Sequence, residues 1–475
     1  MKRMILTVLC GWICAVASAY NGLAGQLDSL IRSSSFLKTS EVGVVVYDLT
    51  DNKELYSYQG EKLYRPASIE KVITAVTALG ILGNDYQFQT RLAYSGTLKE
   101  GELDGNLYVV GGLDPEFMEK DLERLADAVK EAGITSLKGK LVGDVSLLDS
   151  IYWGTGWAWD DTPEPFQPYI SPLMLNRGCM SVTVTPSAKG DTGTVKIFPE
   201  SDFYQVDNRS VSYQPSEGVL SINRNWLENG NIIRITGSVS SPRGRTINVF
   251  DPKSFFMETF RYQLGRKGVA VDRDSIGYGE TPEDARIIYT FRRPMEWVLR
   301  RALKKSDNLS AEALFRHLGI RNGKTTSHLS FEDSQQVINR FMRQSVGHTP
   351  GDYKIVDGSG VSMYNYVSPK LILAYLNYAY RHPEIFRPFY DGLPIAGVDG
   401  TLRYRMSRGK TFRNVHAKTG TVTGISSLAG YVTASNGHWL SFVIINQNVL
   451  KARKARVFQD GVCKILSEMG GESGF

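Results

Sequence analysis

Pro66-Ala67-Ser68-Ile69-Glu70-Lys71 stands directly before an apolar run over residues 72–79, and this stretch decides how the rest of the chain is interpreted. Pro66 suits the entry to a helix, because its φ angle is fixed near the helical value and its missing N–H would have no intrahelical partner. Ser68 is therefore expected in the first helical turn. Lys71 follows three residues later, so its amine should share a helix face with the Ser68 hydroxyl.

This spacing suits nucleophilic chemistry. A serine hydroxyl becomes a good nucleophile only when a base removes its proton, and a lysine can be that base if burial or a second cation lowers its pKa. The free N–H groups at the helix N-terminus would stabilise an oxyanion formed at Ser68. A Ser-x-x-Lys pair also arises by chance in many helices, so the motif alone does not establish a catalytic site.

The start of the chain is typical of a secretory signal peptide over residues 1–19. Lys2 and Arg3 precede an apolar run over 4–16, and Ala17-Ser18-Ala19 provides an A-x-A cleavage site. The run is too short for a membrane span, which needs about 20 apolar residues. We expect a protein secreted across the cytoplasmic membrane into the periplasm or cell-envelope space, with at most peripheral membrane contact.

Composition excludes several classes of protein. The formal net charge of +6 is spread over 475 residues, which leaves no footprint for binding nucleic acid. Cys179 and Cys463 remain after cleavage; a disulfide between them is possible, but the fold does not depend on a disulfide framework. The six histidines show no ligand spacing, so we expect neither a metal nor another cofactor.

Patterning along the chain predicts an α+β domain interrupted by an insert. Strands are predicted at 41–48, 54–58, 415–421, 427–433 and 439–446, with a hairpin turn at Asn436-Gly437. Helices are predicted at 23–31, 295–305, 310–318, 331–343, 369–380 and 451–468, and the last is expected to cover the sheet. Short β-runs dominate 87–288, and the predicted strands there are 89–94, 105–110, 181–186, 194–198, 232–238 and 246–250. The predicted organisation is one domain from 20–86 and 289–475, split by a β-rich insert over 87–288.

Two more triplets carry chemistry. Ser306-Asp307-Asn308 lies between two predicted helices, and Lys418-Thr419-Gly420 lies on a predicted strand. Each is weak alone, because Ser-Asp-Asn also suits helix capping and Lys-Thr-Gly could simply end a strand. In this order after the Ser68 motif, the three together are specific.

With these three motifs the chain resembles the serine penicillin-recognising enzymes. It most resembles the D-alanyl-D-alanine carboxypeptidase/endopeptidase family S13, the low-molecular-mass class C penicillin-binding proteins, which carry a large insert between the first two motifs. Here 234 residues separate Lys71 from Ser306. Similar landmarks occur at 112–115, 156–161, 357–360 and 397–402. The resemblance implies a β-lactamase-like antiparallel sheet flanked by helices, with the insert forming one or two extra domains.

Residue type and resemblance together suggest the catalytic roles. Ser68 would attack the carbonyl of the penultimate D-alanine of a peptidoglycan stem peptide and form an acyl-enzyme. Lys71 would take the serine proton, and Ser306 would pass a proton to the leaving amine. β-Lactam antibiotics would acylate the same serine.

Other residues are expected to bind substrate. Lys418 and Thr419 suit a terminal carboxylate, and Gly420 lets the substrate approach the strand. Asn308 can offer its amide to the substrate backbone. By resemblance, the Thr421 N–H completes the oxyanion hole, and an acid of the insert meets the amino group of a diaminopimelate side chain. The candidate for that acid is Asp161.

Two alternatives are a serine β-lactamase and a catalytically silent scaffold that binds peptidoglycan. The first would be expected to carry a Glu-x-x-x-Asn motif for deacylation, and none of the three glutamates between Ser306 and Lys418 begins one. The second would be expected to have lost the serine, a lysine or the glycine of these motifs. The balance between carboxypeptidase and endopeptidase activity stays open at this point.

Overall fold

The structure is a computed structural model that describes residues 22–323 and 326–470. The predicted signal peptide therefore lies outside the described residues. The chain divides into two compact units, and each is described by itself. Unit 1 comprises residues up to Asn84, Leu299–Asp307 and Gln335 onward, and unit 2 comprises Asp85–Val298 and Asn308–Ser334.

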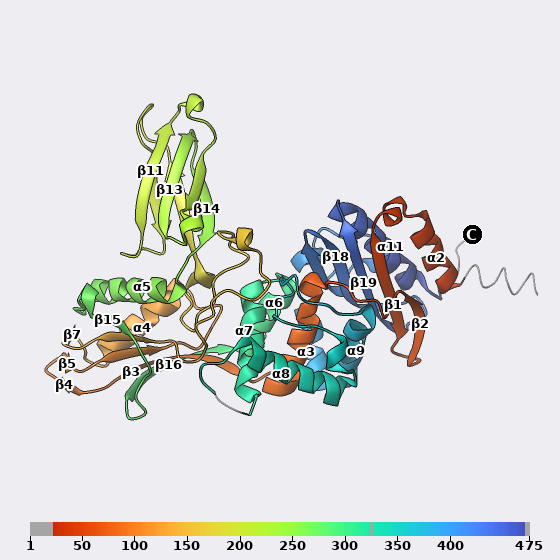
Figure 1. Cartoon of the computed structure of the whole chain (residues 1–475), viewed down its shortest axis with the longest axis horizontal. Coiled ribbons are helices and arrows are strands. Elements are labelled where there is room, and N and C mark those ends of the chain that lie inside the picture. Colours follow the sequence, from red (N-terminus) through yellow and green to blue (C-terminus); the bar gives the residue numbers. More distant parts are fainter. Residues whose placement is uncertain (1–21, 324–325, 471–475) are drawn as a thin grey trace, which may run out of the picture. The chain divides into compact units, whose positions relative to one another are not determined.

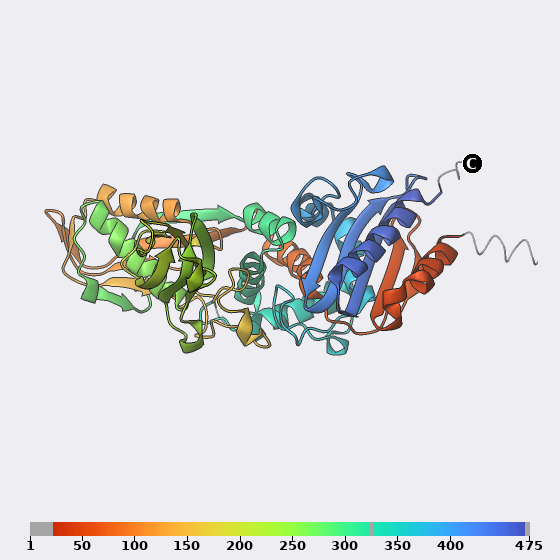
Figure 2. The same ribbon diagram turned by 90° about the horizontal axis from the view of Figure 1, so that it is seen from above.

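Unit 1 is built on an antiparallel sheet with strand order β17-β18-β19-β1-β2 (Figures 1 and 2). The strands are β1 (Glu41–Asp48), β2 (Lys53–Tyr58), β17 (His416–Val422), β18 (Gly424–Thr433) and β19 (Trp439–Val449). The helices are α2 (Leu23–Ser33), α3 (Glu70–Leu82), α9 (Pro369–Arg381), α10 (Pro383–Gly392) and α11 (Ala452–Glu468). The predicted α+β class and the Asn436-Gly437 hairpin turn are confirmed.

Alternation along the strands separates the two helical layers of unit 1. Val44 on β1 faces the same cluster as Leu27 of α2 and Phe458 of α11, so these two helices cover one face of the sheet. Tyr431 and Ser441 point to the opposite face, where they bond to the Leu376 carbonyl and the Asn377 side chain of α9 at 2.8 and 2.6 Å. The last helix therefore covers the sheet, as the sequence predicted (Figure 2).

Unit 2 holds a mixed sheet of order β15-β8-β6-β3-β16 and three-stranded sheets of order β10-β9-β14 and β11-β13-β12. A further short sheet has the order β4-β5-β7, with β4 (Thr97–Lys99), β5 (Glu102–Asp104) and β7 (Ser136–Leu137). The strands of the mixed sheet are β3 (Gln87–Tyr94), β6 (Leu107–Val110), β8 (Leu141–Asp144), β15 (Ile276–Tyr278) and β16 (Arg286–Pro294). The sheets of order β10-β9-β14 and β11-β13-β12 contain β9 (Cys179–Thr185), β10 (Thr194–Phe198), β11 (Gln205–Ser212), β12 (Ser221–Arg224), β13 (Ile232–Val239) and β14 (Arg243–Asn248). Helices α4 (Glu119–Glu131) and α5 (Pro252–Arg266) share its buried apolar cluster.

Unit 2 also contains a segment outside the insert predicted at 87–288. Helix α7 (Asn308–Leu318) carries His317, whose ring bonds to the Gly112 carbonyl at 3.0 Å and to the Tyr86 hydroxyl at 2.7 Å. Arg316 on the same helix is buried and pairs with Asp149 at 2.8 Å. These two buried side chains tie α7 into unit 2, whereas the sequence had assigned the helix to the interrupted domain.

Helices α6 (Met295–Lys304) and α8 (Phe331–Phe341) each contribute residues to both units. The thiols of Cys179 and Cys463 are both buried, and no disulfide joins them. No helix within residues 22–323 and 326–470 has the length and apolar composition needed to cross a membrane.

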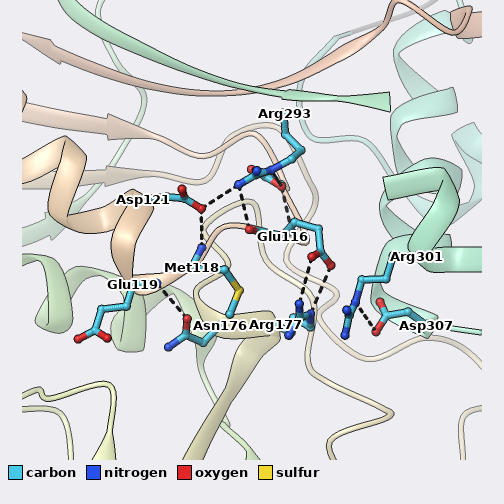
Figure 3. Close-up of polar contacts among 10 residues, drawn as sticks. Glu116, Met118, Glu119, Asp121, Asn176, Arg177, Arg293, Arg301 and Asp307 are labelled. Atoms are coloured by element: carbon cyan, nitrogen blue, oxygen red, sulfur yellow. Dashed lines mark hydrogen bonds and ion pairs between the residues drawn. The ribbon is translucent and has the colours of Figure 1, made fainter. Parts of the chain in front are cut away.

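A buried ion cluster organises the mixed sheet of unit 2 (Figure 3). Arg293 on β16 donates to Asp114 at 3.2 Å, to Asp121 at 2.8 Å and to the Glu116 carbonyl at 3.0 Å. Asp121 also accepts a hydrogen bond from the Met118 N–H at 2.9 Å, at the start of α4. Burial raises the pKa of Asp114 to about 6, although Arg293 favours the carboxylate. One guanidinium thus holds strand, loop and helix together.

Replacing Arg293 by alanine should destabilise unit 2 by about 3–5 kcal/mol, because two buried carboxylates lose their cation. Urea unfolding at neutral pH would measure the loss. The loss should shrink at pH 5, below the raised pKa of Asp114, because that carboxyl is then protonated and no longer needs a cation. Arg292→Ala removes the exposed neighbour on the same strand and is the matched control. Equal stability of the two variants would contradict this role of the cluster.

In unit 1, an ion pair joins the β1–β2 turn to the β18–β19 turn. The His438 ring bonds to Asp48 at 2.7 Å, and this hydrogen bond raises the pKa of His438. Asp51 lies 3.9 Å from His438 and pairs with Lys53 at 2.8 Å. Asp48, Asp51 and His438 are close enough to share a metal ion, but both carboxylates already have cationic partners.

Because the pKa of His438 is raised in the folded state, its stabilisation is complete below the unfolded value near 6.5 and is lost as pH rises through the folded value. His438→Gln should therefore lower Tm at pH 6 and change it little at pH 9. Differential scanning calorimetry across this range gives the comparison. A Tm difference independent of pH would show that the ion pair does not contribute.

Candidate active site

Ser68 lies in a helical turn that leads into α3. A short 3₁₀ segment (Ala67–Ile69) continues into the helix, so Ser68 stands in the first turn as predicted. Pro66 has φ −73°, which suits this entry. The Lys71 Nζ donates to the Ser68 Oγ at 3.0 Å, and the lysine is 1% exposed. The expected pairing of amine and hydroxyl on one helix face is present.

The loop over residues 357–360 accepts hydrogen bonds from Lys71 and from the helix that carries it. The Ser359 carbonyl accepts from the Lys71 Nζ at 2.7 Å, and the Gly358 carbonyl accepts from Thr74 on α3 at 2.8 Å. Asp357 shapes the loop by accepting from the Gly360 N–H at 2.9 Å. Gly360 has φ +79°, and a Cβ there would lie 2.1 Å from the Ala67 carbonyl oxygen. The loop is part of the wall that holds the Ser68 turn.

Strand β17 passes close to the backbone of Ser68. A Cβ on Gly420 would lie 3.0 Å from the Ser68 nitrogen and 2.1 Å from the Ser427 Oγ. Ser427 in turn donates to the Pro66 carbonyl at 2.7 Å. Only glycine permits this approach. Thr421 follows Gly420 on the strand and has an exposed side chain.

Lys418 connects the strand to the Ser306 turn. Its Nζ donates to the Ser306 Oγ at 2.7 Å and to the Thr419 carbonyl at 2.6 Å. The side chain is fully buried, and burial lowers its pKa well below the usual value, with repulsion from Lys71 as the second cause. Unit 1 therefore holds two lysine–serine pairs, Lys71 with Ser68 and Lys418 with Ser306, and the two lysines lie close enough to repel each other.

A loop over 395–401 also contacts this group, although no catalytic or binding role was predicted for its residues. Thr419 donates to the Thr401 hydroxyl at 2.7 Å. Asp399 pairs with Lys304 at 2.7 Å, and Lys304 stands two residues before Ser306. The family landmark over 397–402 pointed to this loop, but no spacing rule connects Thr401 to Thr419.

Two predicted site residues belong to unit 2. Asn308 opens α7, is 9% exposed and donates to the Phe166 carbonyl at 2.9 Å and to the Gln167 side chain at 3.2 Å. Asp161 ends a short 3₁₀ segment (Trp159–Asp161). Burial raises its pKa, helped by Asp160 and Glu164. The roles predicted for Asn308 and Asp161 stay predictions.

Comparison with known proteins places this site in a family. The family model described as D-Ala-D-Ala carboxypeptidase 3 (S13) matches residues 23–469. A D-alanyl-D-alanine carboxypeptidase of Actinomadura sp. (strain R39) is 31% identical and aligns over 94% of this chain and 85% of the relative. The D-alanyl-D-alanine carboxypeptidase DacB of Haemophilus influenzae is 29% identical over 85% of each chain.

A solved structure gives the same result. The crystal structure of penicillin binding protein 4 (dacB) from Haemophilus influenzae matches with a TM-score of 0.81 and 25% identity, covering 93% of this chain and 99% of that one. Both the sequence match and the fold match therefore extend over almost all of the chain. The chain belongs to the D-Ala-D-Ala carboxypeptidase 3 (S13) family of serine peptidases.

Proposed function

We propose that this protein is a serine D-Ala-D-Ala carboxypeptidase that acts on peptidoglycan stem peptides through an acyl-enzyme on Ser68. The observation that carries the proposal is the 3.0 Å hydrogen bond between the Lys71 Nζ and the Ser68 Oγ, in the turn that leads into α3. The relatives named above, called D-alanyl-D-alanine carboxypeptidases, support the substrate class. DD-endopeptidase activity uses the same chemistry with a different leaving amine.

Acylation begins when Lys71 in its neutral form takes the proton of Ser68. The Oγ then attacks the carbonyl carbon of the penultimate D-alanine, and the carbonyl oxygen becomes an oxyanion. The Ser68 N–H and the Thr421 N–H stabilise that charge. The close approach of Gly420 to the Ser68 nitrogen supports this pairing.

Collapse of the tetrahedral intermediate breaks the bond to the leaving D-alanine, whose amine needs a proton. Ser306 relays to this amine the proton that Lys71 took from Ser68, and the Lys418 Nζ orients the Ser306 hydroxyl by donating to it at 2.7 Å. Burial and the nearby Lys71 charge both lower the pKa of Lys418, so a charge on one lysine disfavours a charge on the other. Water then hydrolyses the ester and regenerates Ser68, so the cycle needs no cofactor.

We assign substrate recognition to the side chains that the sequence predicted for it. Lys418 and Thr419 bind the terminal carboxylate of the stem peptide. Asn308 binds the substrate backbone through its amide, and Asp161 faces the side-chain amine of the stem-peptide diamino acid. A substrate in the cell wall requires export, so we assign residues 1–19 to a signal peptide and the mature protein to the periplasm or cell-envelope space.

Benzylpenicillin should acylate Ser68 and remain attached, because none of the glutamates between Ser306 and Lys418 begins the Glu-x-x-x-Asn motif expected for deacylation. Intact-protein mass spectrometry should show one adduct on the parent chain and none on Ser68→Ala. Ser407→Ala, at an exposed serine of the same unit, is the control and should keep the adduct. Rapid loss of penicillin without an adduct would favour the β-lactamase alternative, and an unreactive parent would favour the silent scaffold.

Lys418→Ala should lower kcat/KM for a free-acid stem peptide about 10- to 100-fold more than for its C-terminal amide, because only the acid loses a charge-assisted contact. Steady-state release of the terminal residue from matched acid and amide peptides measures this ratio. Thr421→Ser keeps the backbone N–H and serves as the control. Equal losses on acid and amide would reject the carboxylate assignment and leave only the contact with Ser306.

A further inference from the structure

Two segments of unit 1 carry basic residues without any acidic ones. Residues 400–415 and 449–459 contain no aspartate or glutamate. In the first segment the exposed basic side chains are Arg403, Arg408, Lys410 and Arg413. In the second they are Lys451, Arg453, Lys454 and Arg456. These eight charges exceed the whole chain's formal +6, so the remaining residues carry a formal −2.

The two segments form one surface. Arg405 donates to Asp460 at 2.7 Å, to the Gln459 side chain at 3.1 Å and to the Arg456 carbonyl at 3.3 Å, which fixes the first segment along α11. Asp460 is therefore already paired with Arg405, whose side chain is mostly buried. We call the surface made by the exposed residues of 403–413 and 450–457 the basic surface.

The helical part of the basic surface is the solvent-exposed side of α11, whose other side packs into the core of unit 1. Leu450, Arg453, Lys454 and Val457 are spaced at i, i+3, i+4 and i+7, so they share one side of α11 and the turn before it. The opposite side, which includes Phe458, is buried against the sheet. The outer face is thus free to meet a partner without unfolding the helix.

Three exposed apolar side chains, which we call the apolar tips, lie in the same two segments. Leu450 is 101% exposed, Tyr404 is 87% exposed and Val457 is 65% exposed. A water-soluble polyanion would bind the charges alone and gain little from these tips. A bilayer offers anionic headgroups to the lysines and arginines and an interfacial apolar layer to the tips.

The neighbouring helix does not oppose this charge. Helix α2 packs beside α11, where a Cβ on Gly461 would lie 3.2 Å from Leu30. Its acidic residue, Asp28, accepts a hydrogen bond from the Tyr56 hydroxyl at 2.6 Å, and its Arg32 is exposed. The one aspartate and the one arginine of α2 balance in charge, so this helix adds no net negative charge beside the basic surface.

We propose that the basic surface binds reversibly to an anionic phospholipid bilayer, with Leu450 and Val457 reaching the headgroup layer. The contact is peripheral, since the apolar face of α11 stays in the protein core. It goes beyond the proposed peptidase function and does not depend on it.

The test is co-sedimentation of the full chain with vesicles of phosphatidylcholine alone or mixed with phosphatidylglycerol. The protein should bind only the mixed vesicles and should detach at high salt, where the screening length falls from about 10 Å to about 3 Å. Lys451→Glu, Arg453→Glu and Lys454→Glu combined should weaken binding at least about a hundredfold, because each charge contributes about fivefold. Acids near the start of a helix are favourable, so this variant should fold.

A matched triple variant separates location from net charge. Lys99→Glu, Lys189→Glu and Lys196→Glu change the same number of exposed lysines or arginines in unit 2 and should leave vesicle binding within about twofold of the parent. Leu450→Ser should weaken binding to vesicles but not to soluble polyglutamate. Circular dichroism confirms the fold of each variant.

Three outcomes would overturn the proposal: no binding to mixed vesicles, equal loss in both triple variants, or an unchanged affinity of Leu450→Ser for vesicles together with tight binding of polyglutamate. The last would identify the basic surface as a site for a soluble polyanion. Because none of these variants lies at Ser68, a failed vesicle assay leaves penicillin acylation as a separate result.

Discussion

Two buried lysines, each hydrogen-bonded to a serine hydroxyl, impose the main constraint on unit 1. Lys71 is 1% exposed and Lys418 is fully buried. Burying an ammonium group costs several kcal/mol unless hydrogen bonds replace its water. Backbone carbonyls meet that need: Ser359 accepts from Lys71, and Thr419 accepts from Lys418. The segments that carry these carbonyls must therefore be held in place for the site to exist.

The polar contacts around those segments follow from this need. Asp357 fixes its loop by accepting from the Gly360 N–H, and Gly360 brings the loop against the Ala67 carbonyl. On the other side, Ser427 bonds to Pro66 where Gly420 passes the Ser68 turn. The Ser68 turn is thus held by a loop and a strand that are distant in sequence, and its geometry depends on the folded sheet.

The hydrogen bond between Lys71 and Ser68 could be predicted from the sequence, because the spacing of the two residues is local. Lys71 lies three positions after Ser68, and a helix places residues with this spacing on one face wherever it occurs. The Ser359 carbonyl could not be predicted, since every residue has a carbonyl and only the tertiary fold selects this one. Thr401 was missed for a similar reason. Its hydroxyl accepts from Thr419, which lies 18 positions further along the chain, and no helix or strand period links the two residues.

Secondary structure was predictable where apolar residues repeat and uncertain where they do not. Strand β1 (Glu41–Asp48) matched its prediction because five consecutive residues are buried in a continuous apolar run. Strand β11 (Gln205–Ser212) was missed, since most of its residues are polar and only two are buried. Helix α7 was predicted, but its unit was not: the burial of Arg316 and His317 in unit 2 comes from partners far away in sequence. A charged or polar residue on a helix carries no local sign of whether a distant carbonyl or carboxylate will bury it, so domain membership requires the tertiary structure.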